Sequence, residues 1–184
     1  MLTYLGLGVL LLLPIIVYTA RTVKTSTPSL QWPSIGKVLG FQFADKPARL
    51  MGDFERRHVA VELHNGAVIV TMQLSQPSRL RVEVGDRAEV TRRSGMIVPD
   101  PVVTGDSAFE QRLLARCSDK NAGLAIFEPA LRGQILQQPI VDCIGVCDKV
   151  QWKLPELKDP GPLEEVLQVM TAIASEMERY PANA

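Results

Sequence analysis

Histidine and cysteine are the residue types in this chain whose side chains most directly suggest chemistry at a site. The 184-residue sequence contains two histidines and three cysteines: His58, His64, Cys117, Cys143 and Cys147. The histidines are six residues apart, so both project from one face if a single strand carries them. A metal site would need a third ligand, and no cysteine or acidic cluster lies at helical spacing from either histidine. We therefore expect no metal site, and we interpret His64 as a turn residue.

The cysteines are odd in number and show no CxxC spacing, which argues against a secreted disulfide framework. Cys143 and Cys147 lie on one face of a predicted strand but too far apart for a simple chelate or bridge. Burial in the core is the usual state of a free cysteine. An alternative is a thiol enzyme that uses Cys117 with His58, although no local sequence signature supports it.

Other motifs that carry chemistry are missing from the sequence. It contains no GxGxxG, GxxxxGK[ST], HExxH or GxSxG motif. Its carboxylates are dispersed, so no pair suits acid–base work; they include Asp53, Glu55, Glu62, Asp86 and Asp106. The pairs Arg56-Arg57 and Arg92-Arg93 have two interpretations. They contact anionic headgroups or an acidic partner, or they are simply solvated residues at the ends of strands. We expect no cofactor and no enzymatic activity.

The composition argues against nucleic-acid binding. Lys+Arg and Asp+Glu are both 20, so the net charge is zero and there is no basic excess to bind phosphates. Aromatic residues make up only 5% of the chain, which leaves no evident stacking platform for single strands.

An uncharged apolar run, residues 2–20, precedes all of these residues and predicts a transmembrane anchor over residues 1–24. As a helix it spans roughly 28 Å, close to the hydrocarbon thickness of a bilayer. Pro14 is expected to bend this helix, and Tyr4 and Tyr18 to lie at the two interfaces. Arg21 and Lys24 follow the run, so the positive-inside rule places the N-terminus outside and the domain in the cytoplasm. A cleaved signal peptide is the alternative, but no basic residue precedes the run.

Residues 25–50 have the Pro, Gly, Ser and Thr content of a linker, yet they also contain apolar side chains. One interpretation is a segment that lies along the membrane surface or a partner, with Trp32 at the interface. The other is that these side chains pack on the chain's own domain.

Residues 51–180 predict an α+β domain, a mainly antiparallel sheet with two helices packed on it. Alternation from Arg57, then Asn65-Gly66, predicts a hairpin, and further strands are expected at Leu80–Val84 and Ala88–Arg92. Phe109–Cys117 is ambiguous between helix and strand. The pattern then predicts an N-cap at Ser118-Asp119, a helix broken at Pro129, two strands around Cys147-Asp148, and a last helix from Pro162. Its apolar stripe recurs at spacings of three and four.

Two short motifs, Gly52-Asp53-Phe54-Glu55-Arg56-Arg57 and Thr104-Gly105-Asp106 with Phe109 and Glu110, give the chain a partial resemblance. It resembles uncharacterised bacterial proteins with one N-terminal membrane span, over about residues 50–178. Glu110 stands where that pattern has aspartate. The resemblance implies an α+β fold and no particular activity.

These observations together predict a non-catalytic, single-pass accessory subunit or assembly factor of a larger complex in the inner membrane. Its partners would be membrane lipids and other subunits of a bacterial photosynthetic or respiratory complex. The alternatives are a membrane-tethered thiol enzyme using Cys117 and a membrane-surface sensor that binds lipid or peptide.

Overall fold

A computed structural model of the chain describes residues 31–93 and 98–182. Five residues predicted to contact the membrane or a partner lie outside these ranges: Tyr4, Pro14, Tyr18, Arg21 and Lys24. Within the ranges, no helix has both the length and the apolar character needed to cross a bilayer.

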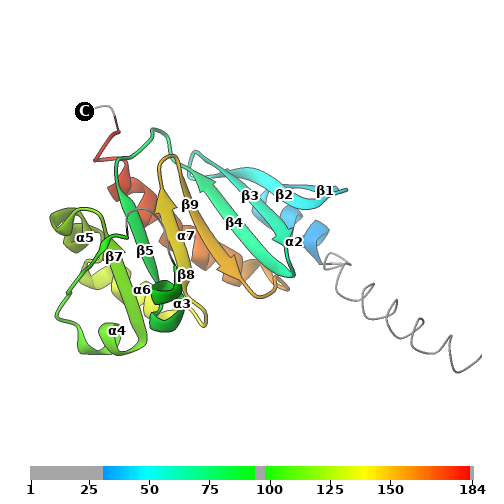
Figure 1. Cartoon of the computed structure of the whole chain (residues 1–184). Coiled ribbons are helices and arrows are strands. Elements are labelled where there is room, and N and C mark those ends of the chain that lie inside the picture. The colour runs from blue at the N-terminus through cyan, green and yellow to red at the C-terminus, as the bar shows by residue number, and fades with distance from the viewer. Residues whose placement is uncertain (1–30, 94–97, 183–184) are drawn as a thin grey trace, which may run out of the picture.

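An antiparallel sheet, nine-stranded over the described residues, forms the centre of the structure (Figure 1). Its spatial order is β1-β2-β3-β4-β9-β8-β5-β7-β6. The strands are β1 (Gln42–Asp45), β2 (Ala48–Phe54), β3 (Arg57–His64), β4 (Ala67–Gln73), β5 (Arg81–Asp86), β6 (Asp100–Pro101), β7 (Leu113–Cys117), β8 (Asp142–Val146) and β9 (Lys149–Leu154).

Helices pack mainly on one face of this sheet. Helix α7 (Pro160–Met177) runs behind the central strands in Figure 1 and contacts β4, β8 and β9. Beside it lie α2 (Trp32–Leu39), α5 (Lys120–Ile126) and α6 (Pro129–Gln137). Helix α4 (Ser107–Arg112) leads directly into β7, and α3 (Arg87–Arg92) packs against the end of β5. The α+β prediction with a mainly antiparallel sheet is confirmed, with more helices than the two expected.

The apolar stripe of α7 supplies much of the core. Its buried residues recur at spacings of three and four and include Leu163, Val166, Leu167, Met170, Ile173, Ala174 and Met177. They face the alternate side chains of the strands, such as Val70 on β4 and Trp152 on β9, which are fully buried.

Local sequence signals placed several turns and helix ends correctly. Asn65 and Gly66 join β3 to β4 with φ of 50° and 81°, as the two left-handed positions of a tight hairpin turn require. The side chain of Asp119 accepts hydrogen bonds from the N–H groups of Asn121 and Ala122, which confirms the predicted N-cap. The predicted break between α5 and α6 at Pro129 is confirmed as well.

Two predictions about the centre of the sheet were wrong. Residues 88–92, expected to form a strand, belong to helix α3, in which Val90 is the buried residue. The expected meander is also interrupted, because β4 pairs with β9 rather than with β5. The hairpin of β8 and β9 fills the gap between them, and β5 pairs with β8 on one side and β7 on the other.

The folded domain begins before residue 51. Residues 31–50, within the predicted linker, form α2, β1 and the start of β2. Trp32 is only 2% exposed and Ile35 only 1%, and both belong to the main core. The Trp32 side chain therefore packs on the chain's own domain and not at a membrane surface. Helix α2 contacts α7, β1 and β2, and its buried side chains extend the core at that end of the sheet.

Candidate functional site

The sheet has two unlike faces. Side chains on β4, β9 and β8 alternate, and one set is buried beneath α7 while the other is partly exposed. On β5, Glu83 belongs to the second set by register but is itself buried. We call the second set's side of the sheet the open face. Cross-strand register places Thr71, Gln151, Ile144 and Glu83 in one row across it. It carries amide, hydroxyl, aliphatic and charged groups within one row.

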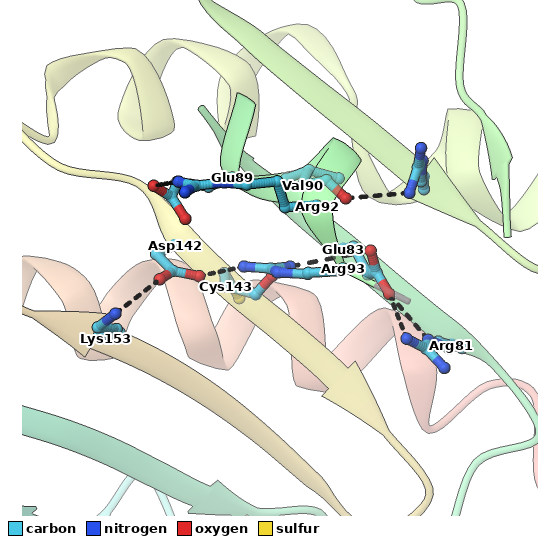
Figure 2. Close-up of polar contacts among 10 residues, drawn as sticks. Arg81, Glu83, Glu89, Val90, Arg92, Arg93, Asp142, Cys143 and Lys153 are labelled. Atoms are coloured by element: carbon cyan, nitrogen blue, oxygen red, sulfur yellow. Dashed lines mark hydrogen bonds and ion pairs between the residues drawn. The ribbon is translucent and has the colours of Figure 1, made fainter. Parts of the chain in front are cut away.

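A cluster of charged side chains occupies the open face over β9, β8, β5 and β7. We call it the charge network; it consists of Arg81, Glu83, Arg93, Arg116, Asp142 and Lys153. Figure 2 shows most of these groups in front of the strands, with α7 on the far side of the sheet.

Arg93 is the central cation of the charge network. It follows the last residue of α3, and its side chain crosses the open face to form an ion pair with Asp142. Its Nη1 donates to the carbonyl oxygen of Cys143 at 2.9 Å and lies 3.9 Å from Oε2 of Glu83. Lys153 Nζ reaches Asp142 from the other side at 3.9 Å. Arg93 therefore connects β8 to β5 through side chains as well as through the backbone ladder.

Glu83 is the most buried charge in the network, at 1% exposure. Its Oε1 accepts a hydrogen bond from Nε of Arg81 at 2.8 Å, and Nη2 of Arg81 forms an ion pair with the same oxygen at 2.7 Å. Its Oε2 makes no hydrogen bond with any described residue. Across the ladder it faces Arg116, whose Nη1 donates to the carbonyl oxygen of Val90 at 3.1 Å. Burying such a carboxylate is tolerable only with cations around it.

Helix α3 can approach the sheet because Gly85 has no side chain. A Cβ at Gly85 would lie 2.8 Å from the carbonyl oxygen of Val141 and 3.2 Å from Cγ2 of Val90. With hydrogen there instead, Val90 packs fully buried against β5. This packing brings Arg93, three residues later, onto the open face.

A shallow hollow of about 180 Å³ lies beside the charge network. Its lining combines two isoleucines, a tryptophan, an amide and three charged residues of the network: Ile69, Ile144, Trp152, Gln151, Arg93, Asp142 and Lys153. Gln151 is held in place because its Nε2 donates to Oγ1 of Thr71 at 3.1 Å. The hollow offers charged, amide and apolar contacts within one side-chain length of each other.

The histidines are not part of this site. His58 lies on β3 and its Nδ1 is 3.4 Å from the carboxylate of Asp53 on β2, with both side chains largely exposed. His64 ends β3, directly before the Asn65-Gly66 turn. Among the described residues, no group of three or more His, Cys, Asp or Glu side chains could hold a metal ion.

Two of the three cysteines are core residues. Cys117 and Cys143 are buried, and burial raises the pKa of both thiols, that of Cys143 to about 12. Cys117 lies five strand positions from His58, roughly 24 Å at the usual strand spacing, so the structure does not bring this pair together. Cys147 is exposed in the β8–β9 turn, with φ of 54°.

The motifs behind the family resemblance have structural roles. Glu55 and Arg56 form the β2–β3 turn, both with positive φ. In the second motif, Oε1 of Glu110 accepts from the N–H groups of Thr104 and Gly105 and from the Thr104 hydroxyl. The Gly105 N–H, first among these donors, lowers the pKa of Glu110. The side chain of Asp106 caps α4 and forms an ion pair with Arg132. The hydrogen bond from the N–H of Phe109 is the main cause of the lowered pKa of Asp106.

The sequence pointed to one residue of the charge network as a possible contact. Arg93 belongs to the Arg92-Arg93 pair, and its neighbour Arg92 is 69% exposed and pairs with Glu89 on the same helix. Arg57 of the other pair binds Glu178 instead, with Nη2 to Oε2 at 2.7 Å. The sequence did not mark Glu83 as a site residue, because a charged residue in an alternating strand ordinarily lies on the solvated face.

No family model matches the chain, and no curated protein matches it. A solved structure with a similar fold is the crystal structure of the mycobacterial trehalose monomycolate transport factor A, TtfA. The similarity has a TM-score of 0.60 and covers 81% of this chain and 93% of that one, at 10% sequence identity. At this identity the likeness shows the fold alone.

Proposed function

We propose that this protein is a non-catalytic accessory subunit or assembly factor of a larger membrane protein complex. The open face with its charge network is the observation that carries the proposal. It presents ion pairs, a buried carboxylate with one oxygen that makes no hydrogen bond to the described residues, and a hollow lined by charged, amide and apolar groups. A surface that mixes charged, polar and apolar groups has the composition of a non-obligate protein interface, which is about as apolar as the rest of a protein's surface.

The apolar run at residues 2–20 supports membrane attachment as a single span, with the domain on the cytoplasmic side. The host would be a photosynthetic, respiratory or transport assembly. We add transport assemblies to this set because the structure with a similar fold is named as a transport factor.

Purification of the full chain in a gentle detergent, followed by native mass spectrometry, tests this proposal. We expect the chain to migrate with other subunits in a complex of defined stoichiometry. A chain that migrates alone as a monomer contradicts an accessory role. A chain found free in the soluble fraction, trimmed near Thr19 or Ala20, contradicts the anchor.

A further inference from the structure

Basic groups outnumber acidic ones on the open face around the charge network. The strands β9, β8, β5 and β7, together with Arg93, place five basic side chains there: Lys149, Lys153, Arg81, Arg116 and Arg93. Two carboxylates, Glu83 and Asp142, lie among them. This imbalance contrasts with the zero net charge of the whole chain. The surface is therefore locally complementary to a negative partner.

The basic groups lie at two depths. Lys153 is 56% exposed and can reach outward, whereas Arg93 is 18% exposed and its guanidinium is held by Asp142 and the Cys143 carbonyl oxygen. Between them, the hollow exposes parts of Ile69 and Ile144. A ligand that contacts both depths must project a narrow anionic group inward and cover the two isoleucines at the same time.

We infer that the open face binds an acidic, partly apolar segment of a partner protein. A carboxylate of that segment enters the hollow near Arg93 and Lys153, and a neighbouring apolar side chain packs on Ile69 and Ile144. This inference rests on the proposed function, since it names the surface and the chemistry of the partner.

A protein segment fits this surface better than an anionic membrane does. A bilayer presents a broad plane of headgroups, which exposed and flexible lysines contact readily. Here Arg81, Arg93 and Glu83 are recessed and already paired with one another. An extended segment can insert single side chains between such groups, and its apolar residues use the isoleucines.

A fluorescein-labelled peptide of alternating glutamate and leucine serves as the probe, with the full chain in nanodiscs of uncharged lipid. We expect saturable binding by fluorescence anisotropy that weakens as salt is raised. Lys149→Glu/Lys153→Glu should raise the Kd by about tenfold or more, because two attractive charges become repulsive. Hydrogen exchange should slow in the β8–β9 hairpin when the probe is bound.

The matched control is Lys37→Glu/Lys120→Glu, which makes the same charge change on α2 and α5, across the sheet. Its Kd should stay within about twofold of the unmodified chain. A peptide of opposite charge shows whether the double variant is folded. Lys149→Glu/Lys153→Glu should bind a lysine–leucine peptide that the unmodified chain does not bind.

Absence of peptide binding, or equal weakening by both double variants, overturns the inference. So does binding only to vesicles containing phosphatidylserine, which would identify the face as a lipid surface. If the peptide fails but the chain still migrates within a complex, the inference falls and the accessory role stands. If the peptide binds and the chain migrates alone, the accessory role falls.

Discussion

Glu178 ties the end of α7 to the rest of the domain through one carboxylate. It accepts from Arg57 Nε at 3.2 Å and Nη2 at 2.7 Å, and from the N–H of Ser75 at 2.7 Å. Both partners of the ion pair are largely buried, so their interaction is screened less than that of a surface pair. Removing the charge leaves the Arg57 guanidinium without its anion.

We expect Glu178→Gln to lower the free energy of unfolding at pH 7 by about 1–3 kcal/mol. Burial raises the pKa of Glu178, but the hydrogen bonds from Arg57 and Ser75 outweigh it and bring the pKa below the usual 4.5. A lowered folded pKa stabilises the protein above the unfolded pKa, and this contribution is lost as pH falls through the folded value. The difference between the two proteins should therefore shrink below about pH 4.5.

Urea unfolding in mild detergent measures this effect, with the fluorescence of the buried Trp32 and Trp152 as the signal. Glu176→Gln is the control, because its partner Arg179 is 71% exposed and this pair should contribute less than about 0.5 kcal/mol. Equal losses in the two variants, or a difference that grows at low pH, would contradict the assigned role of Glu178.

The three thiols are expected to react very differently in the native chain. Cys147 is exposed in a turn, whereas Cys117 and Cys143 are buried and burial raises their pKa. Since the thiolate is the reactive species, only Cys147 should be alkylated near neutral pH. Mass spectrometry after iodoacetamide should show one label, none in Cys147→Ser, and all three cysteines labelled after unfolding. Rapid native labelling of Cys117 would instead revive the thiol-enzyme alternative.

Sequence reasoning about individual residues worked where the environment is local. The expectation of burial held for the thiols of Cys117 and Cys143 but not for that of Cys147, which is exposed. The interpretation of His64 as a turn residue was wrong by one position, because His64 is the last residue of β3 and pairs with Ala67 across the turn. It missed Glu83, because the alternation of residues 80–84 describes only the strand itself. The carboxylate is buried between Arg81 on the same strand and Arg93, which follows α3, and the periodicity of the strand does not reveal the approach of Arg93.

The approach of α3 to β5 can be tested through Gly85. Gly85→Ala places a Cβ 2.8 Å from the Val141 carbonyl oxygen, a backbone atom that cannot move freely. We expect a loss of about 1–3 kcal/mol in unfolding free energy, typical of overpacking. Gly133→Ala in α6 is the matched control, because its Cβ meets no atom within 4 Å and should stabilise by up to about 1 kcal/mol.

Urea unfolding of both glycine variants provides the measurement. The double variant Gly85→Ala/Val90→Ala should be no more stable than Gly85→Ala, because the contact with the carbonyl oxygen remains and truncation of the buried Val90 leaves a cavity. A Gly85→Ala protein as stable as the unmodified chain would show that neither the Val141 carbonyl oxygen nor Val90 lies as close to Gly85 as the structure has it.

Elements defined by neighbouring residues were predicted well, and those defined by distant partners were not. The Asn65-Gly66 hairpin, the Asp119 cap and the stripe of α7 depend on residues within one or two turns. The pairing of β4 with β9 joins segments from opposite ends of the domain, and alternation alone does not specify which strand is the neighbour. Residues 88–92 were misassigned because a single buried apolar residue, Val90, gives no helical period.

The extent of the whole domain also depends on such distant packing. Composition placed its start at residue 51, yet α2 and β1 contribute core residues Trp32, Ile35 and Phe41, and Leu50 lies fully buried on β2. Each such side chain stabilises the fold by about 1.5–3 kcal/mol when buried. Together they approach the entire stability of a typical domain, about 5–15 kcal/mol.

A chain that begins at residue 31 should therefore fold without the apolar run, and one that begins at residue 51 should not. Circular dichroism during heating is the measurement: the first should melt cooperatively, and the second should aggregate or show no transition. Trp32→Ala in the longer chain is an intermediate case, with an expected loss of about 3–5 kcal/mol from the cavity it leaves. A cooperative transition at the same temperature in the chain from residue 51 would show that residues 31–50 are a linker that the fold does not need.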